Sequence, residues 1–282
     1  MTTWALAQDA RRFAAVIACI AFAAAIAGCG GNSNVHSIPA PASITGNWGL
    51  TANLTSGGTV PIDVYLTSNA GSVSGIAYGP AATDNVCVAN GCCGSPLGFF
   101  SGVALTGTVD ASGNLKLGTP STASNPAFAM TGTVSGSTLS NGSFTLSGTC
   151  NTQGTIAGIE YPPLDGTYIG TLTSQVTGQS FTMSITLSQS SAPNASGYLN
   201  LYETATVTGY PCIPSGTAMP VIVSSTYLGN YFSFPLSLSS GGLLDQVGTL
   251  STNGKTLGMD YSFPESGSSC SDDYGSGTLT LQ

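Results

Sequence analysis

Residues 60–66 read Val-Pro-Ile-Asp-Val-Tyr-Leu, and residues 181–187 read Phe-Thr-Met-Ser-Ile-Thr-Leu. In both stretches an apolar residue alternates with a residue that is mostly polar. Successive side chains of a β-strand point to opposite faces, so this pattern is typical of a strand with one buried and one solvated face. Short runs of this kind, separated by Gly, Ser, Thr and Asn, recur after residue 28, where no segment shows a sustained helical period. The sequence therefore predicts an all-β protein.

The two stretches belong to an internal repeat, in which they are related by a shift of 121 residues. At a shift of 120, residues 44–48 (Ile-Thr-Gly-Asn-Trp) fall on residues 164–168 (Leu-Asp-Gly-Thr-Tyr), and Cys92 and Cys150 fall on Cys212 and Cys270. Similar composition does not readily place two cysteines and an aromatic residue at one common shift. We infer that an ancestral unit was duplicated, and the predicted domains are residues 44–163 and residues 164–282.

Each repeat is long enough for about eight antiparallel strands. Closure into a barrel removes the unpaired edges that proteins otherwise protect with lysine, and this chain contains only Lys116 and Lys255. We therefore expect two tandem antiparallel up-and-down β-barrels. Two β-sandwiches are the alternative, because alternation with a period of two occurs in both architectures.

The start of each repeat carries a family resemblance. Gly46-Asn47-Trp48 resembles the Gly-x-Trp start of lipocalins, and residues 44–48 are even more similar to the first strand of avidin-type barrels. The resemblance covers about five residues and recurs at residues 166–168. Lipocalins usually add a late arginine that packs on the tryptophan, whereas no arginine follows residue 12 here. The resemblance implies the topology of avidin-like and lipocalin-like (calycin) barrels and no more.

The N-terminus has the organisation of an export signal. Two arginines at positions 11 and 12 precede an apolar run over residues 13–26. This run of 14 residues is shorter than the roughly 20 that a transmembrane helix needs. The sequence therefore predicts that residues 1–28 are a signal peptide.

Residues 26–29 (Ile-Ala-Gly-Cys) resemble the lipobox of bacterial lipoproteins, in which the cysteine becomes the mature N-terminus and carries the acyl chains. The resemblance implies lipidation of Cys29, with membrane lipid as its partner, and a signal peptide cut without lipidation is the alternative. Because Gly30 is not aspartate, similarity to Gram-negative sorting signals favours the outer membrane or cell surface. Residues 29–43 are rich in Gly, Pro and Ser, and we expect a flexible stalk.

Charge is the scarcest component of the chain, at 6% of residues. Cleavage after residue 28 would leave two lysines against eleven acidic residues, a balance of −9. A surface with so few cations cannot neutralise a phosphate backbone, which argues against nucleic acid as a partner.

Six cysteines remain after cleavage and lipidation, and in an exported chain they predict three disulfides. The repeat favours the pairs Cys212–Cys270 and Cys92–Cys150, which leaves Cys87 to pair with Cys93. Exchange of the adjacent Cys92 and Cys93 stays open. A zinc site at Cys87, Cys92 and Cys93 is disfavoured, because no histidine is nearby.

No catalytic constellation emerges from the sequence. The single histidine, His36, falls in the predicted stalk, which argues against a Ser-His-Asp device. We interpret Glu160 and Asp165 as a solvated linker, and Asp272 and Asp273 as an exposed turn rather than a calcium site. We therefore expect a non-enzymatic protein without metal or cofactor.

Aromatic residues give the one indication of binding. Within the barrels they could line a cavity for a small apolar or carbohydrate ligand, and they could equally fill the core without any ligand. The candidate binding residues are Trp48, Tyr168, Tyr198, Phe232 and Phe234. The expected function is ligand binding by a membrane-anchored lipoprotein, and the alternative is a structural or adhesive surface protein with solid barrels.

Overall fold

The fold was described from a computed structural model. It divides into two units, Met1–Pro39 and Ala40–Gln282, and all strands belong to the second. The described residues form strands, turns and loops and contain no helix. A helix that could cross a membrane is therefore not found among the residues that the structure describes. They are residues 39–79, 101–119, 127–147, 151–211, 213–222, 225–238, 242–263 and 272–282.

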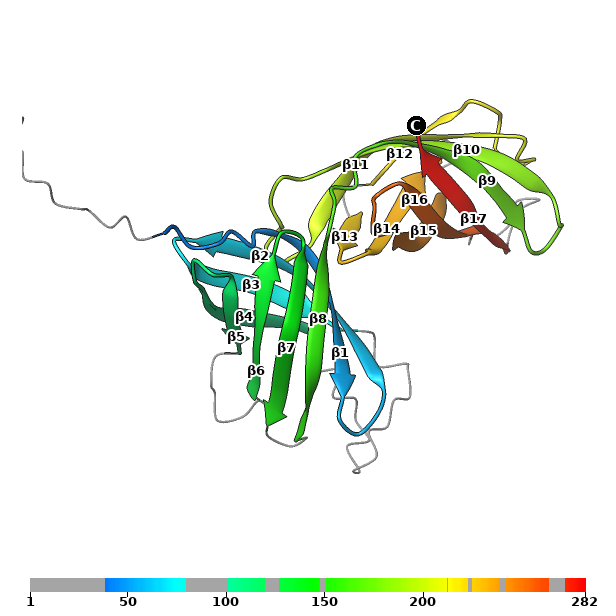
Figure 1. The fold of residues 1–282 in the computed structure, drawn as a ribbon. Coiled ribbons are helices and arrows are strands. Elements are labelled where there is room, and N and C mark those ends of the chain that lie inside the picture. The colour runs from blue at the N-terminus through cyan, green and yellow to red at the C-terminus, as the bar shows by residue number, and fades with distance from the viewer. Residues whose placement is uncertain are drawn as a thin grey trace, which may run out of the picture. The chain divides into compact units, whose positions relative to one another are not determined.

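Barrel 1 is a closed ring of eight antiparallel strands in which each strand pairs with the next along the chain (Figure 1). Pairing of the first strand with the eighth closes the ring. The strands are β1 (Gly46–Leu54), β2 (Thr59–Asn69), β3 (Ser72–Tyr78), β4 (Ser101–Val109), β5 (Asn114–Gly118), β6 (Ala127–Ser135), β7 (Thr138–Ser147) and β8 (Thr152–Tyr161).

Barrel 2 repeats this order with one interruption. Its strands are β9 (Gly166–Ser174), β10 (Ser180–Gln189), β11 (Leu199–Thr208), β12 (Ala218–Pro220), β13 (Thr226–Leu228), β14 (Tyr231–Ser237), β15 (Leu243–Leu250), β16 (Thr256–Phe263) and β17 (Asp273–Leu281). The short strands β12 and β13 both pair with β11, and β13 continues the ring to β14. Pairing of β10 with β11 and of β17 with β9 closes eight strands into a barrel. The predicted fold of two tandem antiparallel barrels is confirmed, and the sandwich alternative is wrong.

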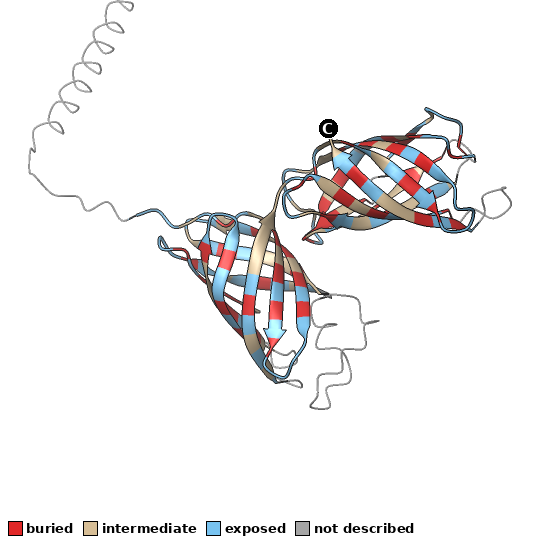
Figure 2. Ribbon diagram, turned by 45° about the vertical axis from the view of Figure 1, so that its right-hand side comes forward, coloured by how far each residue is buried: buried red, intermediate tan, exposed pale blue. Residues whose placement is uncertain are grey.

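The alternating stretches that predicted the fold are the inner faces of β2 and β10. Figure 2 shows buried and exposed positions alternating along the strands of both barrels. The alternating apolar residues that predicted these two strands are buried in two separate cores, one for each barrel. These residues are Val60, Ile62, Val64 and Leu66 in β2, and Phe181, Met183, Ile185 and Leu187 in β10.

Equivalent residues of the two barrels can be found by starting at corresponding positions of β1 and β9 and following the directly paired residues around each ring. One interior row in barrel 1 crosses β1, β8, β7, β6 and β5, and the equivalent row in barrel 2 crosses β9, β17, β16, β15 and β14. The barrel 1 row consists of Leu54, Gly154, Phe144, Met130 and Leu117. The barrel 2 row consists of Ser174, Gly275, Tyr261, Gln246 and Phe234.

Each row contains a glycine that faces an aromatic ring on the neighbouring strand. A Cβ on Gly154 would lie 2.9 Å from the ring of Phe144, and one on Gly275 would lie 2.7 Å from the ring of Tyr261. Each would also collide with a backbone carbonyl of the strand on the other side. An aromatic side chain that covers a glycine on the adjacent strand is a known way to pin register in sheets. Its recurrence at equivalent positions supports the duplication.

The two barrels also contact each other within the second unit. The side chain of Asn47 in β1 is buried and pairs with the backbone of Gly229, the first residue of the turn between β13 and β14. Its Nδ2 donates to the carbonyl of Gly229 at 2.8 Å, and its Oδ1 accepts from the Gly229 N–H at 2.6 Å. Tyr65 and Tyr161 of barrel 1 pack against the core of barrel 2.

Candidate functional site

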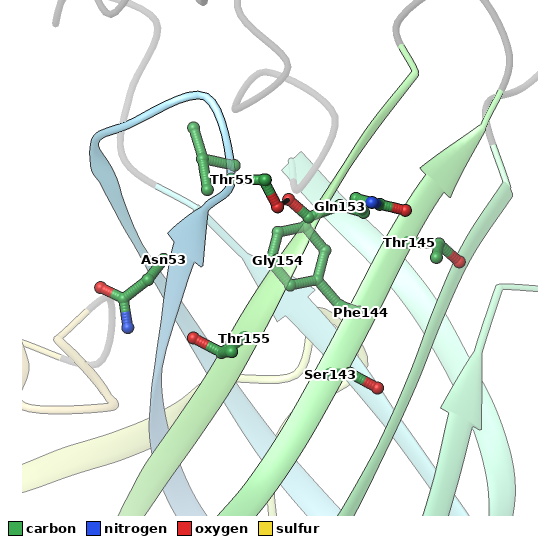
Figure 3. Close-up of a pocket in the computed structure, with 9 residues that line it drawn as sticks. Asn53, Thr55, Ser143, Phe144, Thr145, Gln153, Gly154 and Thr155 are labelled. Carbon is green, nitrogen blue, oxygen red and sulfur yellow. Dashed lines mark hydrogen bonds between the residues drawn. The ribbon is translucent and has the colours of Figure 1, made fainter.

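An open hollow of about 570 Å³ lies on barrel 1 where β1, β7 and β8 approach their ends (Figure 3). Three residues of the barrel 1 row border it, namely Leu54, Gly154 and Phe144. Because Gly154 has no side chain, the ring of Phe144 lies across β8 at this point, as Figure 3 shows. The other six described residues around it are Asn53, Thr55, Ser143, Thr145, Gln153 and Thr155.

These six side chains carry hydroxyl or carboxamide groups, and none of the nine described residues around the hollow is ionisable. Some of the groups have protein partners: the hydroxyl of Thr55 donates to the carbonyl of Gln153 at 2.9 Å, and Asn53 Oδ1 accepts from the hydroxyl of Thr59 at 3.1 Å. The Asn53 amide NH₂ can still donate. The hollow therefore offers uncharged hydrogen-bonding groups beside apolar surface.

The opposite end of each barrel is closed by an aromatic residue that the sequence suggested for ligand binding. Trp48 and Tyr168 are equivalent, and both are fully buried. The indole N–H of Trp48 donates to the carbonyl of Ile44 at 3.0 Å, and the hydroxyl of Tyr168 donates to the carbonyl of Gly254 at 3.0 Å. Each polar atom has a backbone partner, so in this conformation both residues act as core and end-closing groups.

The other three candidate residues are not brought together with these two. Phe232 and Phe234 lie inside barrel 2, with ring centroids 5.3 Å apart, and both are fully buried. Tyr198 precedes β11 and its ring lies 4.4 Å from that of Tyr78 in barrel 1. None of the five candidates is among the described residues that line the hollow.

A buried polar cluster at one end of barrel 2 is absent from the sequence-based expectations. Asp273, the first residue of β17, is only 6% exposed. Its Oδ1 accepts from the hydroxyl of Ser174 at 2.6 Å, and its Oδ2 accepts from the hydroxyls of Tyr210 at 2.8 Å and Tyr261 at 3.1 Å. The expectation of an exposed turn at Asp272 and Asp273 is therefore wrong for Asp273, because its side chain turns into the barrel end while Asp272 stays exposed.

A second pocket, of about 360 Å³, has Glu160 and Asp165 among the residues that line it. The pair interpreted as a solvated linker thus borders a common space. Partial burial raises the pKa of Glu160 above its ordinary value. Asp165 Oδ1 accepts from the backbone N–H of Gln189 at 2.8 Å, which fixes the start of barrel 2.

Burial has a larger effect on Asp63 of β2, whose carboxyl lies where the two barrels meet. A Cβ on Gly229 would collide with this carboxyl group. Desolvation raises the pKa of Asp63 from 3.8 to about 7.

Several predicted sites lie outside the described residues, so they stay predictions. They are the lipidation site Cys29, His36, and the disulfide residues Cys87, Cys92, Cys93, Cys150, Cys212 and Cys270. Among the residues that the structure does describe, no group of three or more His, Cys, Asp or Glu side chains could hold a metal ion.

Comparison with protein-family models and with curated proteins finds no match for this chain. Among solved structures, the chain is similar to a protein of unknown function from the DUF3598 family of Nostoc punctiforme. The two share 9% sequence identity with a TM-score of 0.26, and the match covers 85% of this chain and 96% of that one. The class of the protein therefore rests on its own coordinates, which define a tandem pair of closed antiparallel β-barrels.

Proposed function

We propose that this chain is an exported lipoprotein, anchored to the membrane through Cys29, whose first barrel binds a small neutral carbohydrate. The hollow at Phe144 carries the proposal. Its hydroxyl and carboxamide groups match the alternating donors and acceptors of a sugar, and Leu54 and the largely buried ring of Phe144 border it with apolar atoms. The lack of ionisable groups among the described residues that line it favours a neutral ligand over a charged one.

Binding tests on the mature chain would use neutral sugars, namely glucose, galactose, N-acetylglucosamine and maltose, in calorimetric and NMR titrations. The matched variants are Asn53→Ala and Thr155→Ala at the hollow, and Thr173→Ala and Ser276→Ala at the equivalent positions of barrel 2. Loss of one hydrogen bond of about 1 kcal/mol predicts a roughly fivefold lower affinity for each hollow variant. The barrel 2 variants should bind as the unmodified chain does.

Absence of saturable binding to all four sugars would overturn the carbohydrate proposal. So would equal losses in the hollow variants and in the barrel 2 variants. Lipidation has a separate test, because Cys29→Ser should release the chain from the membrane fraction whether or not the chain binds sugar. Retention of the Cys29→Ser chain in that fraction would overturn the anchor.

A structural or adhesive role is the second candidate, and the packing of the interiors favours it. The largest side chains inside the barrels, among them Trp48, Tyr168, Tyr227, Phe232 and Phe234, are fully buried within the two cores. Such filled interiors are the property expected of solid barrels. Saturable sugar binding at the hollow would argue against this second candidate.

A further inference from the structure

The polar cluster of barrel 2 contains one member that does not come from the barrel wall. Ser174, Tyr261 and Asp273 lie on strands β9, β16 and β17. Tyr210 instead lies in the connection between β11 and β12, directly after Gly209, whose φ of 86° is in the left-handed region. The connection therefore inserts a phenol into the end of a barrel whose wall is built without it.

The phenol of Tyr210 is bound there as a ligand would be. Its ring centroid lies 4.5 Å from that of Phe181, 6.2 Å from that of Tyr261 and 6.4 Å from that of Phe263. Its hydroxyl donates to Asp273 Oδ2. Burial and this hydrogen bond raise the pKa of Tyr210 above its ordinary value, so the phenol keeps its proton and remains a donor.

The same end of barrel 1 is where the hollow lies. The hollow is bordered by Leu54, Gly154 and Phe144, whose equivalents in the barrel 2 row are Ser174, Gly275 and Tyr261. Tyr210 contacts Tyr261 directly and shares Asp273 with Ser174. Tyr210 thus lies inside the end of barrel 2 that corresponds to the end of barrel 1 where the hollow lies.

A second observation points to the same place. Gln246 lies opposite Tyr261 in the barrel 2 row and is only 1% exposed. Neither its Nε2 nor its Oε1 has a hydrogen-bond partner. A buried carboxamide without partners costs free energy, and the equivalent residue of barrel 1 is Met130, which avoids this cost. Barrel 2 therefore holds hydrogen-bonding capacity beside Tyr261 that its own fold does not use.

We propose that the end of barrel 2 is a binding site for a small neutral phenol or aryl alcohol, and that the side chain of Tyr210 occupies this site in the conformation described here. The ligand displaces Tyr210, donates a hydrogen bond from its hydroxyl to Asp273 Oδ2, and packs its ring against Phe181, Tyr261 and Phe263. The carboxamide of Gln246 is available to a further polar substituent of the ligand. No bond is made or broken.

The test uses p-cresol, which reproduces the tyrosine side chain, and toluene, which lacks the hydroxyl. In calorimetric titrations of the mature chain, Tyr210→Ala should bind p-cresol at least tenfold more tightly than the unmodified chain, because the internal competitor is gone. Tyr210→Ala should bind toluene at least tenfold more weakly than p-cresol, and adding Asp273→Asn should weaken p-cresol binding about tenfold. Tyr231→Ala, at a tyrosine exposed on β14, is the matched control and should behave as the unmodified chain.

The unmodified chain gives an independent measurement that does not depend on the folding of a variant. Saturating p-cresol should increase amide hydrogen exchange at Gly209 and Tyr210 and in residues 215–217, because Tyr210 leaves the barrel end, while the barrel strands stay protected. Unchanged exchange in these residues would overturn the displacement of Tyr210. Equal affinity of folded Tyr210→Ala for toluene and p-cresol, or no saturable binding of either, would overturn the phenol site.

Discussion

The equivalent interior rows of the two barrels show how copies of one architecture have diverged. The barrel 1 row is apolar throughout, whereas the barrel 2 row has a serine, a glutamine and a tyrosine hydroxyl at three of its five positions. Both rows keep the glycine that faces an aromatic ring, so the wall geometry is shared. Within the rows the difference is one of side-chain chemistry, and outside them barrel 2 has an additional connection that places Tyr210 in its end.

This contrast indicates which parts of a duplicated barrel can vary. Register depends on backbone pairing and on the aromatic–glycine contact, and altering either would disturb neighbouring strands. Polar groups at a barrel end are tolerated because they can pair with one another, as Asp273 does with three hydroxyl groups. The two ends could therefore acquire different ligand preferences on one scaffold.

The largest expected effect on stability comes from Asp63, which lies on the outer face of barrel 1. Its equivalent in barrel 2 is Ser184. Because folding raises the pKa of Asp63 from 3.8 to about 7, this group lowers stability as pH rises from about 4 to about 7, and the loss is complete above pH 7. At about 1.4 kcal/mol per pKa unit, Asp63→Asn should stabilise the chain by about 4 kcal/mol at pH 8 and change little at pH 4.

Urea unfolding of both chains between pH 4 and pH 8 measures this difference. Ser184→Asn at the equivalent position is the control and should leave the pH dependence unchanged. A parallel pH dependence in the Asp63→Asn chain would contradict a protonated Asp63 at neutral pH.

The next largest effect on stability is expected at Asp273, at the end of barrel 2. Its equivalent in barrel 1 is Thr152. Asp273→Ala leaves three buried hydroxyl groups without their acceptor and should destabilise barrel 2 by about 3 kcal/mol. Thr152→Ala removes no such acceptor and should change stability by less than about 0.5 kcal/mol. Chemical denaturation of the two variants checks the contrast, and similar losses would show that the cluster adds no stability of its own.

Because the wall geometry is shared, replacing either row glycine by alanine should cost the same amount of stability. Gly154→Ala and Gly275→Ala each introduce a methyl group against a carbonyl and an aromatic ring, which should cost about 2 kcal/mol in either barrel. Gly258→Ala, where an added Cβ meets only ordinary contacts, is the control. Thermal unfolding of the three variants measures the costs, and a loss at only one row glycine would contradict the equivalence of the rows.

The smallest effect on stability is expected when Gln246 and Met130, which are equivalent in the two rows, are each replaced by the other residue type. Gln246→Met gives barrel 2 the residue of barrel 1 and should stabilise it by about 1 kcal/mol, because an unpaired carboxamide leaves the core. Met130→Gln should destabilise barrel 1 by a similar amount. Urea midpoints of the two chains test this reciprocity. A loss of stability in Gln246→Met would mean that the carboxamide makes a favourable interaction in the native protein.

The sequence predicted the parts of the fold that depend on local pattern. Alternation in residues 60–66 and 181–187 identified β2 and β10 with their correct inner faces, because side-chain direction in a strand has a period of two. The repeat predicted two copies of one unit. Closure into barrels followed only from the scarcity of lysine and a five-residue resemblance, and strand pairing in the structure decided it.

The candidate site could be predicted far less well. Aromatic residues were identified as binding candidates, but burial of Trp48, Tyr168, Phe232 and Phe234 depends on what faces them from other strands. The residues around the hollow are serines, threonines and amides of a kind that occurs throughout the chain, so no local signal marks them. Likewise, the acidic pair at 272 and 273 gave no sign that one carboxyl meets two tyrosines.

By itself, the sequence determined an all-β chain built from two copies of one unit, since alternation and repetition are properties of the order of residues. Only the tertiary structure decided that Leu54 and Phe144 border a hollow while Tyr210 fills the matching end of barrel 2. Tyr210 lies 63 residues before Asp273 in the chain, and no periodicity connects them. Their contact exists because strand register and barrel closure bring distant segments to one end, which is a property of the folded ring and not of any segment within it.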